Sequence, residues 1–218
     1  MIKAIIFDQD GVIIDSEPLH YESVRILLKK HNIPFSKEEH KKFQGRNLRD
    51  LLEEVLKDRK INQTIEELIN ENRKIWEELA KQDLKIFPGF YRLIKLIKKK
   101  YKIALTTSVR RKTREIVEEI FPEQKGIFEV EVTGEEVKNT KPHPEPYLST
   151  ATRLKLKPEE CIVIEDTING IKSAKAAGMK VIAITNTFGK KVLEKENPDI
   201  IINSLKEINL KFIKNLEK

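Results

Sequence analysis

The sequence predicts an α/β protein with a doubly wound parallel β-sheet and an inserted all-helical domain. Two observations support this fold class. Short runs of β-branched and apolar residues recur along the 218-residue chain, and segments with helical periodicity separate most of them. One long interval near the amino terminus has helical periodicity but no convincing strand. The composition, 39% hydrophobic and 35% charged, is that of a globular protein long enough to bury a core.

The predicted sheet consists of six short apolar segments. Between them, Ile116, Val117 and Ile120 fall on one face of a helix, and Gly178 is placed to end a later helix before the next strand. The six strands are expected at residues 4–7, 103–105, 128–132, 161–164, 181–184 and 200–202.

The interval without strands is predicted to be a separate helical domain. It contains four consecutive amphipathic segments, and Trp76 lies on the apolar face of the last one, where it is interpreted as a core residue. We therefore expect a Rossmann-like core formed by residues 1–15 and 82–218, and a helical cap domain at residues 16–81.

The cysteine content and the amino terminus indicate where the protein works. Cys161 is the single cysteine, so the chain cannot form an internal disulfide, and no spacing around it suggests a zinc site. The apolar run at residues 4–7 is too short for a signal peptide or a membrane span. We expect a cytoplasmic protein without a membrane partner.

The net charge of +7 is compatible with several anionic partners, including nucleic acid, membranes and phosphorylated substrates. However, Lys98, Lys99 and Lys100 close a predicted helix, where cations interact favourably with the carbonyl end of the helix dipole. These lysines are therefore interpreted as a solvated helix end, and no specific nucleic-acid partner is expected.

Two predicted strands end in pairs of carboxylates. Asp8 and Asp10 follow the first strand, with Gly11 allowing a tight turn, and Glu165 and Asp166 end the fourth. The carboxyl ends of parallel strands meet at one edge of a sheet, so neighbouring strands would bring these carboxylates together. Their mutual repulsion would be severe without a hard divalent cation, and Mg²⁺ suits such a set of oxygen ligands.

Hydroxyl groups and a lysine are expected at the same edge. Thr107 and Ser108 end the second strand, and Lys141 is held in a loop stiffened by two prolines. Together these groups have the chemistry to hold an anion. Taken singly, Thr107 is better explained as a strand end and Lys141 as a surface lysine.

These residues resemble the sequence motifs of the haloacid dehalogenase superfamily, in the branch with a helical cap inserted after the first motif. The similarity covers nearly the whole chain, and all four family motifs occur in order. The matching stretches are residues 7–12, 15–17, 107–108, 141–142, 165–171 and 176–179. The resemblance implies a Mg²⁺-dependent phosphohydrolase that forms an aspartyl-phosphate.

By this resemblance, Asp8 is the nucleophile and a Mg²⁺ ligand. Asp10 is the general acid and then the general base, and its backbone carbonyl also binds the metal. Asp166 is the remaining direct ligand, and Glu165 supports the metal shell. Gln9 departs from the family, whose members usually carry an apolar residue there, but its side chain is expected to face away from the site.

The other two motifs are implied to bind the phosphoryl group. Thr107 and Ser108 would contact the phosphoryl oxygens, and Lys141 would balance the charge between the nucleophile and the phosphate. The presence of an acid at Asp10 argues against the dehalogenase reaction that named the superfamily, because the dehalogenases lack this residue.

The cap is expected to contribute substrate contacts. Glu17 and His20 lie where the chain enters it, and Arg46 lies in a polar loop between two of its helices. Arg46 is suited to a charged leaving group, whereas Arg49 is better explained as a solvated helix residue. His20 fits a functional role and a plain helix-surface role equally well.

Three functions remain open from the sequence. The first is a phosphatase acting on a small phosphorylated metabolite. The second is a phosphosugar mutase such as β-phosphoglucomutase, although the cap arginine of those mutases falls near Leu48, and a later basic residue corresponds to Ile69. The third is a non-catalytic basic binding module, which only the net charge favours. The sequence indicates neither the metabolite nor the oligomeric state.

Overall fold

The computed structural model describes residues 1–44 and 47–216. These residues form two compact units, Met1–Asp15 with Lys85–Lys218 and Ser16–Leu84, which we call the core and the cap. The core contains β1 (Ala4–Phe7), β2 (Ile14–Asp15), β3 (Lys85–Ile86), α5 (Phe90–Ile97), β4 (Lys102–Thr106), α6 (Arg111–Ile120), β5 (Val130–Val132), α7 (Glu145–Leu154), β6 (Cys161–Glu165), α8 (Ile168–Ala176), β7 (Lys180–Ile184), α9 (Lys190–Leu193), β8 (Ile200–Ile202) and α10 (Leu210–Asn215). Short 3₁₀ turns include η2 (Gly134–Glu136) and η5 (Leu205–Glu207).

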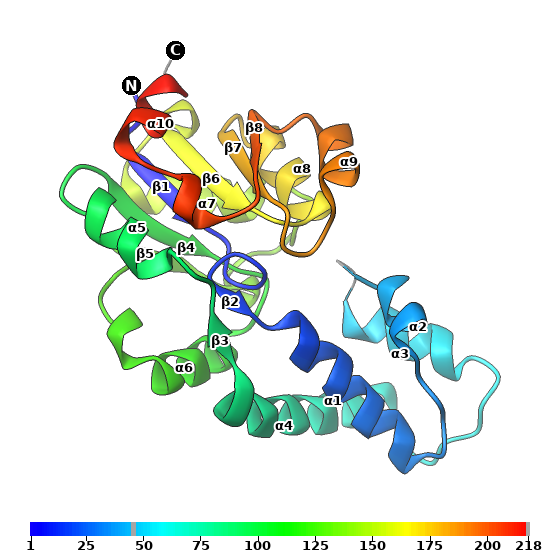
Figure 1. The fold of residues 1–218 in the computed structure, drawn as a ribbon. Helices are drawn as coiled ribbons and strands as arrows, with labels where there is room; N and C mark the ends of the chain where they lie inside the picture. The colour runs from blue at the N-terminus through cyan, green and yellow to red at the C-terminus, as the bar shows by residue number, and fades with distance from the viewer. Residues whose placement is uncertain (45–46, 217–218) are drawn as a thin grey trace. The chain divides into compact units, whose positions relative to one another are not determined.

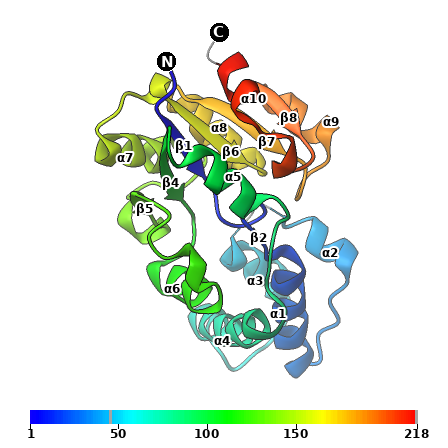
Figure 2. The same ribbon diagram turned by 60° about the vertical axis from the view of Figure 1, so that its left-hand side comes forward.

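The core is a six-stranded parallel sheet with strand order β5-β4-β1-β6-β7-β8. Helices cover both faces of the sheet: α7 and α8 lie on one, and α5 and α10 on the other (Figures 1 and 2). The central strands are buried along their whole length, which explains their uninterrupted apolar sequences. The predicted doubly wound parallel fold is confirmed.

The order of the strands determines which loops lie next to one another. β1 pairs with β4 on one side and with β6 on the other, so the carboxyl ends of these three strands lie side by side. The loops that follow them carry the first, second and fourth sequence motifs. A ligand site at this edge is the usual arrangement in open parallel sheets.

The cap is all-helical and has its own apolar core. Its helices are α1 (Glu17–Lys30), α2 (Lys37–Lys41), α3 (Leu48–Leu56) and α4 (Ile65–Asp83). α1 packs along α4. The apolar core of the cap includes the buried residues Leu27 and Leu28 of α1, Leu52 of α3 and Leu68 of α4. Thr64 forms a capping box with Glu67 at the start of α4, which satisfies backbone N–H groups that would otherwise lack partners.

Three local features differ from the sequence-based expectations. The two-residue strands β2 and β3, which precede and follow the cap in the sequence, pair antiparallel, and strands this short leave no periodicity in the sequence. α4 continues to Asp83, so the predicted domain boundary between residues 81 and 82 falls inside its last turn. β5 begins at Val130 rather than at residue 128. Among the described residues, no helix combines the length and apolarity that crossing a membrane requires.

Candidate active site

Asp8 lies at the centre of the candidate site, because it follows β1, the strand between β4 and β6. It follows β1 directly, its backbone N–H donates to Ile164 O at 3.1 Å, and its side chain is almost completely buried. The next residues form a tight loop in which the backbone carbonyl of Gln9 accepts hydrogen bonds from the N–H groups of Val12, Ile13 and Ile14. Within the loop Asp10 forms an isolated bridge with Ile14, and its carboxylate lies close enough to Asp8 for its charge to raise the pKa of Asp8.

Gly11 allows this loop to pass close to β6. Its φ of +75° lies in the left-handed region, and a Cβ atom at this position would overlap Asp166 Oδ2. The side chain of Asn186 donates to Gly11 O at 2.7 Å and holds the loop. Gln9 corrects one expectation, because its side chain is fully buried and its amide donates to Asp10 Oδ2 at 3.3 Å instead of avoiding the site.

Lys141 connects the carboxylates of two strands. Its Nζ donates to Asp8 Oδ1 at 2.7 Å, to Glu165 Oε1 at 2.6 Å and to Thr106 O at 3.1 Å. The side chain is only 6% exposed. All three ammonium protons therefore have acceptors, and Lys141 is a site residue rather than a surface lysine.

Glu165 and Asp166 are adjacent but have different surroundings. Glu165 Oε2 accepts from the N–H groups of Asp166 and Thr167 and from the Thr167 hydroxyl, at 3.0–3.1 Å. Glu165 Oε1 accepts from Lys141 and from the hydroxyl of Tyr147 at 2.8 Å. In contrast, both carboxylate oxygens of Asp166 are buried without a hydrogen bond of normal geometry.

These surroundings shift the pKa values of the site. Burial raises the pKa of Asp8 to about 7, with Lys141 opposing the shift and Glu165 adding to it. Burial, followed by the charges of Glu165 and Asp8, raises the pKa of Asp166 well above its usual range, although the nearby Thr187 hydroxyl and the charge of Lys141 oppose the shift. Burial alone would lower the pKa of Lys141, but the two carboxylates raise it, so its ammonium stays charged.

The residues present fit a divalent cation. Ligand atoms of Asp8, Glu165 and Asp166 all lie within 4.8 Å of one another. The buried, unbonded oxygens of Asp166 are the kind of group that a hard cation satisfies, and a cation would keep both Asp8 and Asp166 ionised at neutral pH. The structure therefore contains an acidic group able to hold a metal ion.

Thr107 and Ser108 follow β4 at the same edge. The Thr107 N–H donates to Val132 O at 2.9 Å, and its buried hydroxyl accepts from the Val109 N–H at 3.2 Å. Ser108 is exposed. Gly134, the first residue of η2, lies against this turn, because a Cβ atom there would overlap the carbonyl oxygen of Ser108. The turn thus lies next to Thr106, whose carbonyl binds Lys141.

Within the cap, Glu17 and His20 lie in the first turn of α1. Glu17 Oε1 accepts from His40 Nε2 at 3.1 Å and from the amide of Gln44 at 2.8 Å. Burial alone would raise the pKa of Glu17, but these hydrogen bonds outweigh it and lower the pKa. The His20 ring stacks on buried Trp76 with a centroid distance of 5.7 Å. Arg46, the third predicted cap residue, lies outside the described residues.

The structure adds residues that the sequence motifs did not indicate. Tyr147 donates to Glu165 from the start of α7, and Gly170 lies against the Glu165 carboxylate, where a Cβ atom would overlap it. The glycine lies in the fourth motif, so its position could have been suspected. Tyr147 lies among the buried residues of α7, so the sequence around it does not indicate that its hydroxyl contacts the site.

Comparisons with known proteins agree with this geometry. Residues 5–184 match the family model described as haloacid dehalogenase-like hydrolase. The chain is 32% identical over 221 residues to the phosphorylated carbohydrates phosphatase of Thermotoga maritima. The alignment covers 95% of this chain and 100% of that protein. It is 27% identical over 210 residues to the pyrophosphatase PpaX of Bacillus cereus, spanning 95% and 94% of the two chains.

Solved structures agree as well. A candidate beta-phosphoglucomutase of Thermotoga maritima superposes with a TM-score of 0.81 at 30% identity and covers 99% of this chain and 100% of that one. A HAD hydrolase of family IA, variant 3, from Entamoeba histolytica gives a TM-score of 0.89 at 26% identity and covers 99% of each chain. The chain therefore belongs to the haloacid dehalogenase-like hydrolase family and is a phosphoric monoester hydrolase.

Proposed function

We propose that this enzyme is a Mg²⁺-dependent phosphatase that removes phosphate from a small phosphorylated carbohydrate through an aspartyl-phosphate on Asp8. The observation that carries the proposal is the contact of Lys141 with Asp8 at the end of β1, beside the unbonded carboxylate of Asp166. A nucleophile, a fixed cation and a metal-binding carboxylate are the parts that phosphoryl transfer requires.

In the first half of the reaction, a carboxylate oxygen of Asp8 attacks phosphorus, and the bond from phosphorus to the ester oxygen breaks. Asp10 donates its proton to the departing oxygen, so that the product leaves as an alcohol. Thr107 and Ser108 are proposed to bind the phosphoryl oxygens, and Lys141 balances their negative charge beside Asp8.

In the second half, water attacks the phosphorus of the aspartyl-phosphate. Asp10, now ionised, takes the proton from the water, and the bond between phosphorus and the Asp8 oxygen breaks to release inorganic phosphate. The same residue thus serves as acid and then as base, which requires Asp10 to be beside the nucleophile but free to change its protonation state.

The metal would be held by Asp8, Asp166 and the backbone carbonyl of Asp10. When bound, Mg²⁺ supplies positive charge that offsets the repulsion between the carboxylates and the incoming phosphate. The chain's own part is to keep two carboxylates buried and close together. Their raised pKa values are the electrostatic cost of that arrangement without a cation.

The proposed substrate class rests on the relatives. The phosphatase of Thermotoga maritima, named for phosphorylated carbohydrates, matches along nearly the whole of both chains, the cap included. In the cap, Glu17 is kept ionised by His40 and Gln44, which suits hydrogen bonding with hydroxyl groups. Glu17, His20 and Arg46 remain proposed substrate contacts.

A mutase is the second candidate, because structures named as beta-phosphoglucomutases from Thermotoga maritima and Clostridium difficile are 30% and 25% identical to this chain. Two cap positions argue against it. Leu48 and Ile69, where we expected the basic residues of those mutases, pack against the apolar cluster of the cap. A cap without these cations is poorly equipped to hold a second phosphate.

The deciding experiment supplies purified enzyme with Mg²⁺, β-glucose 1-phosphate and a trace of glucose 1,6-bisphosphate, and follows inorganic phosphate and glucose 6-phosphate together. We expect inorganic phosphate as the main product and no turnover in excess chelator. Accumulation of glucose 6-phosphate faster than inorganic phosphate would identify a mutase. Full activity in chelator would refute the metal requirement. A panel of other sugar phosphates then tests the substrate class.

A further inference from the structure

Tyr147 is a buried tyrosine whose hydroxyl points into the active site rather than into the apolar core. It lies near the start of α7, and its side chain has no solvent exposure. The hydroxyl donates to Glu165 Oε1 at 2.8 Å, and the Lys141 ammonium lies 4.9 Å from the centre of its ring. One residue outside the four motifs thus contacts two residues within them.

The hydrogen bonds of Glu165 leave it little capacity to bind a metal. One oxygen accepts from Lys141 and Tyr147, and the other from two backbone N–H groups and the Thr167 hydroxyl. An ionised carboxylate has about four lone-pair sites, so five donors saturate it. The neighbouring Asp166 has no hydrogen bond of normal geometry and is the better ligand.

Glu165 is also prevented from turning towards another partner. The α-carbon of Gly170 lies so close that a Cβ atom would overlap the carboxylate, and Thr167 holds the far oxygen from the start of α8. The tyrosine closes the remaining side. This carboxylate is therefore fixed in orientation by groups from α7, from α8 and from the turn between β6 and α8.

The residue that gains from this rigidity is Lys141. A lysine side chain is long and flexible, and its correct placement costs conformational entropy unless other groups hold it. Here Glu165 Oε1 receives one ammonium proton at 2.6 Å while Asp8 receives another at 2.7 Å. The tyrosine ring limits movement of the ammonium group on one side.

We propose that Tyr147 is a positioning residue for phosphoryl transfer: its hydroxyl and Glu165 hold the Lys141 ammonium beside Asp8, and Glu165 acts as this anchor rather than as a direct metal ligand. The inference rests on the proposed function, and it replaces the metal-supporting role that the family resemblance implied for Glu165.

The test is Tyr147→Phe, which keeps the ring and removes only the hydroxyl. Loss of a hydrogen bond to a charged group should lower kcat by about 5- to 20-fold. The Mg²⁺ dissociation constant, measured by isothermal titration calorimetry without substrate, should stay unchanged. The matched control is Tyr101→Phe, which alters another buried tyrosine at the amino-terminal end of β4, and it should keep wild-type kcat.

Two further variants separate an anchor from a ligand. Glu165→Gln should lower kcat more than Tyr147→Phe and leave Mg²⁺ binding nearly intact, whereas Asp166→Asn should weaken Mg²⁺ binding. An unchanged kcat in Tyr147→Phe would overturn the proposal. So would a loss of Mg²⁺ affinity in Tyr147→Phe or Glu165→Gln that matches the loss in Asp166→Asn, because Glu165 would then be a ligand.

A readout without turnover keeps this test distinct from the proposed function. Trifluoroberyllate mimics a phosphoryl group on an aspartate, and ¹⁹F NMR of its adduct reports the surroundings of each fluorine. In Tyr147→Phe we expect the adduct to form with one shifted fluorine resonance, from the atom nearest Lys141. Identical spectra would overturn the positioning role. A wild-type enzyme that forms no adduct and releases no phosphate would refute the proposed function itself.

Discussion

Asp8 and Asp10 lie two residues apart, yet their surroundings suit different chemical tasks. Asp8 is buried and bonded to Lys141, which holds its carboxylate in one place, as the proposed attack on phosphorus requires. Asp10 is half-buried, and Gln9 donates to its Oδ2. A group that must gain and lose a proton benefits from such access, whereas a nucleophile benefits from a fixed position.

This difference predicts different outcomes for two isosteric changes. Asp8→Asn removes the nucleophile and should abolish phosphate release. Asp10→Asn keeps the nucleophile but loses proton transfer, so kcat should fall by about 10²–10⁴-fold. Phosphate release by each variant is compared with wild type at equal Mg²⁺, and circular dichroism confirms folding. Measurable turnover in Asp8→Asn, or an undiminished rate in Asp10→Asn, would contradict the assigned roles.

At the scale of elements, an ion-pair network ties together the segments before and after the third motif. Arg114 of α6 is fully buried and bonds Glu131 of β5 at 3.1 Å, and Arg111 bonds both Glu131 and Glu136. Arg153 of α7 also bonds Glu136, at 2.7 Å. The network links α6, β5, η2 and α7, the elements on either side of the loop that carries Lys141.

Glu136 is the carboxylate through which this network should depend on pH. Partial burial alone would raise its pKa, but hydrogen bonds from Arg153 and Thr133 outweigh it and lower the pKa from 4.5 to about 2. Because the pKa of Glu136 is lower in the folded state than in the unfolded state, the ionised carboxylate stabilises the fold at pH values above its unfolded pKa. This contribution is lost as the pH falls from about 4.5 to about 2.

We therefore expect Glu136→Gln to lower the free energy of unfolding at pH 7 by about 1–2 kcal/mol, a figure discounted because the side chain is 29% exposed. The difference from wild type should shrink as pH falls through this window. Urea unfolding at several pH values measures it. Glu119→Gln on exposed α6 surface is the control and should have little effect at any pH. A pH-independent difference would contradict the electrostatic explanation.

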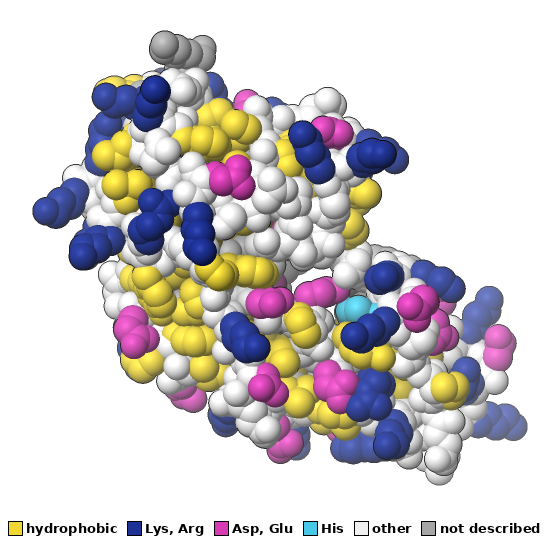
Figure 3. Space-filling view, in the orientation of Figure 1, with side chains coloured by type: hydrophobic (Ala, Val, Ile, Leu, Met, Phe, Trp, Pro, Cys, Tyr) yellow, Lys and Arg dark blue, Asp and Glu magenta, His cyan; other side chains and the backbone are white. Residues whose placement is uncertain are grey.

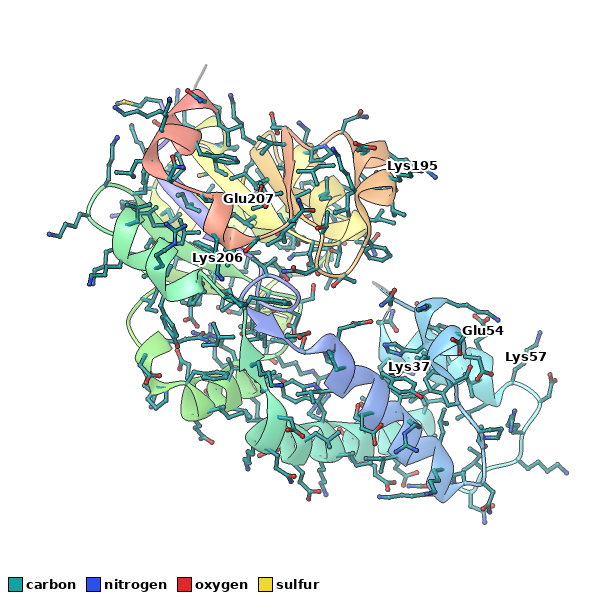
Figure 4. All side chains as sticks on the ribbon, viewed as in Figure 1. Lys37, Glu54, Lys57, Lys195, Lys206 and Glu207 are labelled. Carbon is teal, nitrogen blue, oxygen red and sulfur yellow. The ribbon has the colours of Figure 1, made fainter. Side chains whose placement is uncertain are left out.

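At the scale of the molecule, much of the net charge lies over one face of the core. The helices α5 and α10 and the turn η5 carry exposed cations, and their one acidic residue is Glu207 (Figures 3 and 4). Among the described residues, none of these cations forms an ion pair with an acid. They are Arg92 and Lys95 of α5, Lys98 and Lys99 directly after it, Lys206 of η5, and Lys211 and Lys214 of α10.

A diffuse lysine-rich face of this kind should attract polyanions without reading their sequence. We expect weak binding to duplex DNA that falls by about 10- to 100-fold between about 50 and 200 mM salt, with no preference among sequences. Fluorescence anisotropy with two unrelated duplexes measures both properties. Tight, sequence-selective binding that survives physiological salt would contradict the prediction that nucleic acid is not a specific partner.

The fold class and the main catalytic candidates could be read from local sequence patterns. Apolar runs bounded by turn residues indicate the strands. The carboxylates and Thr107 lie at or directly after strand ends, and Lys141 lies in a loop stiffened by two prolines. These signals are local because strand periodicity and motif spacing extend over only a few residues. The strands β2 and β3 are too short to show such a periodicity, and the same local patterns did not define where α4 ends.

The division of work among the acidic residues depends on contacts between distant parts of the chain. Glu165 and Asp166 are indistinguishable as neighbours in the sequence, but Lys141 and Tyr147 reach one of them from 24 and 18 residues away, and Gly11 leaves room for the other. Burial then raises the pKa of Asp166, while the charge of Lys141 and the hydrogen bonds to Glu165 outweigh burial and lower the pKa of Glu165. Burial and hydrogen bonding are properties of packed neighbours in space, so they arise only when the strands and helices come together.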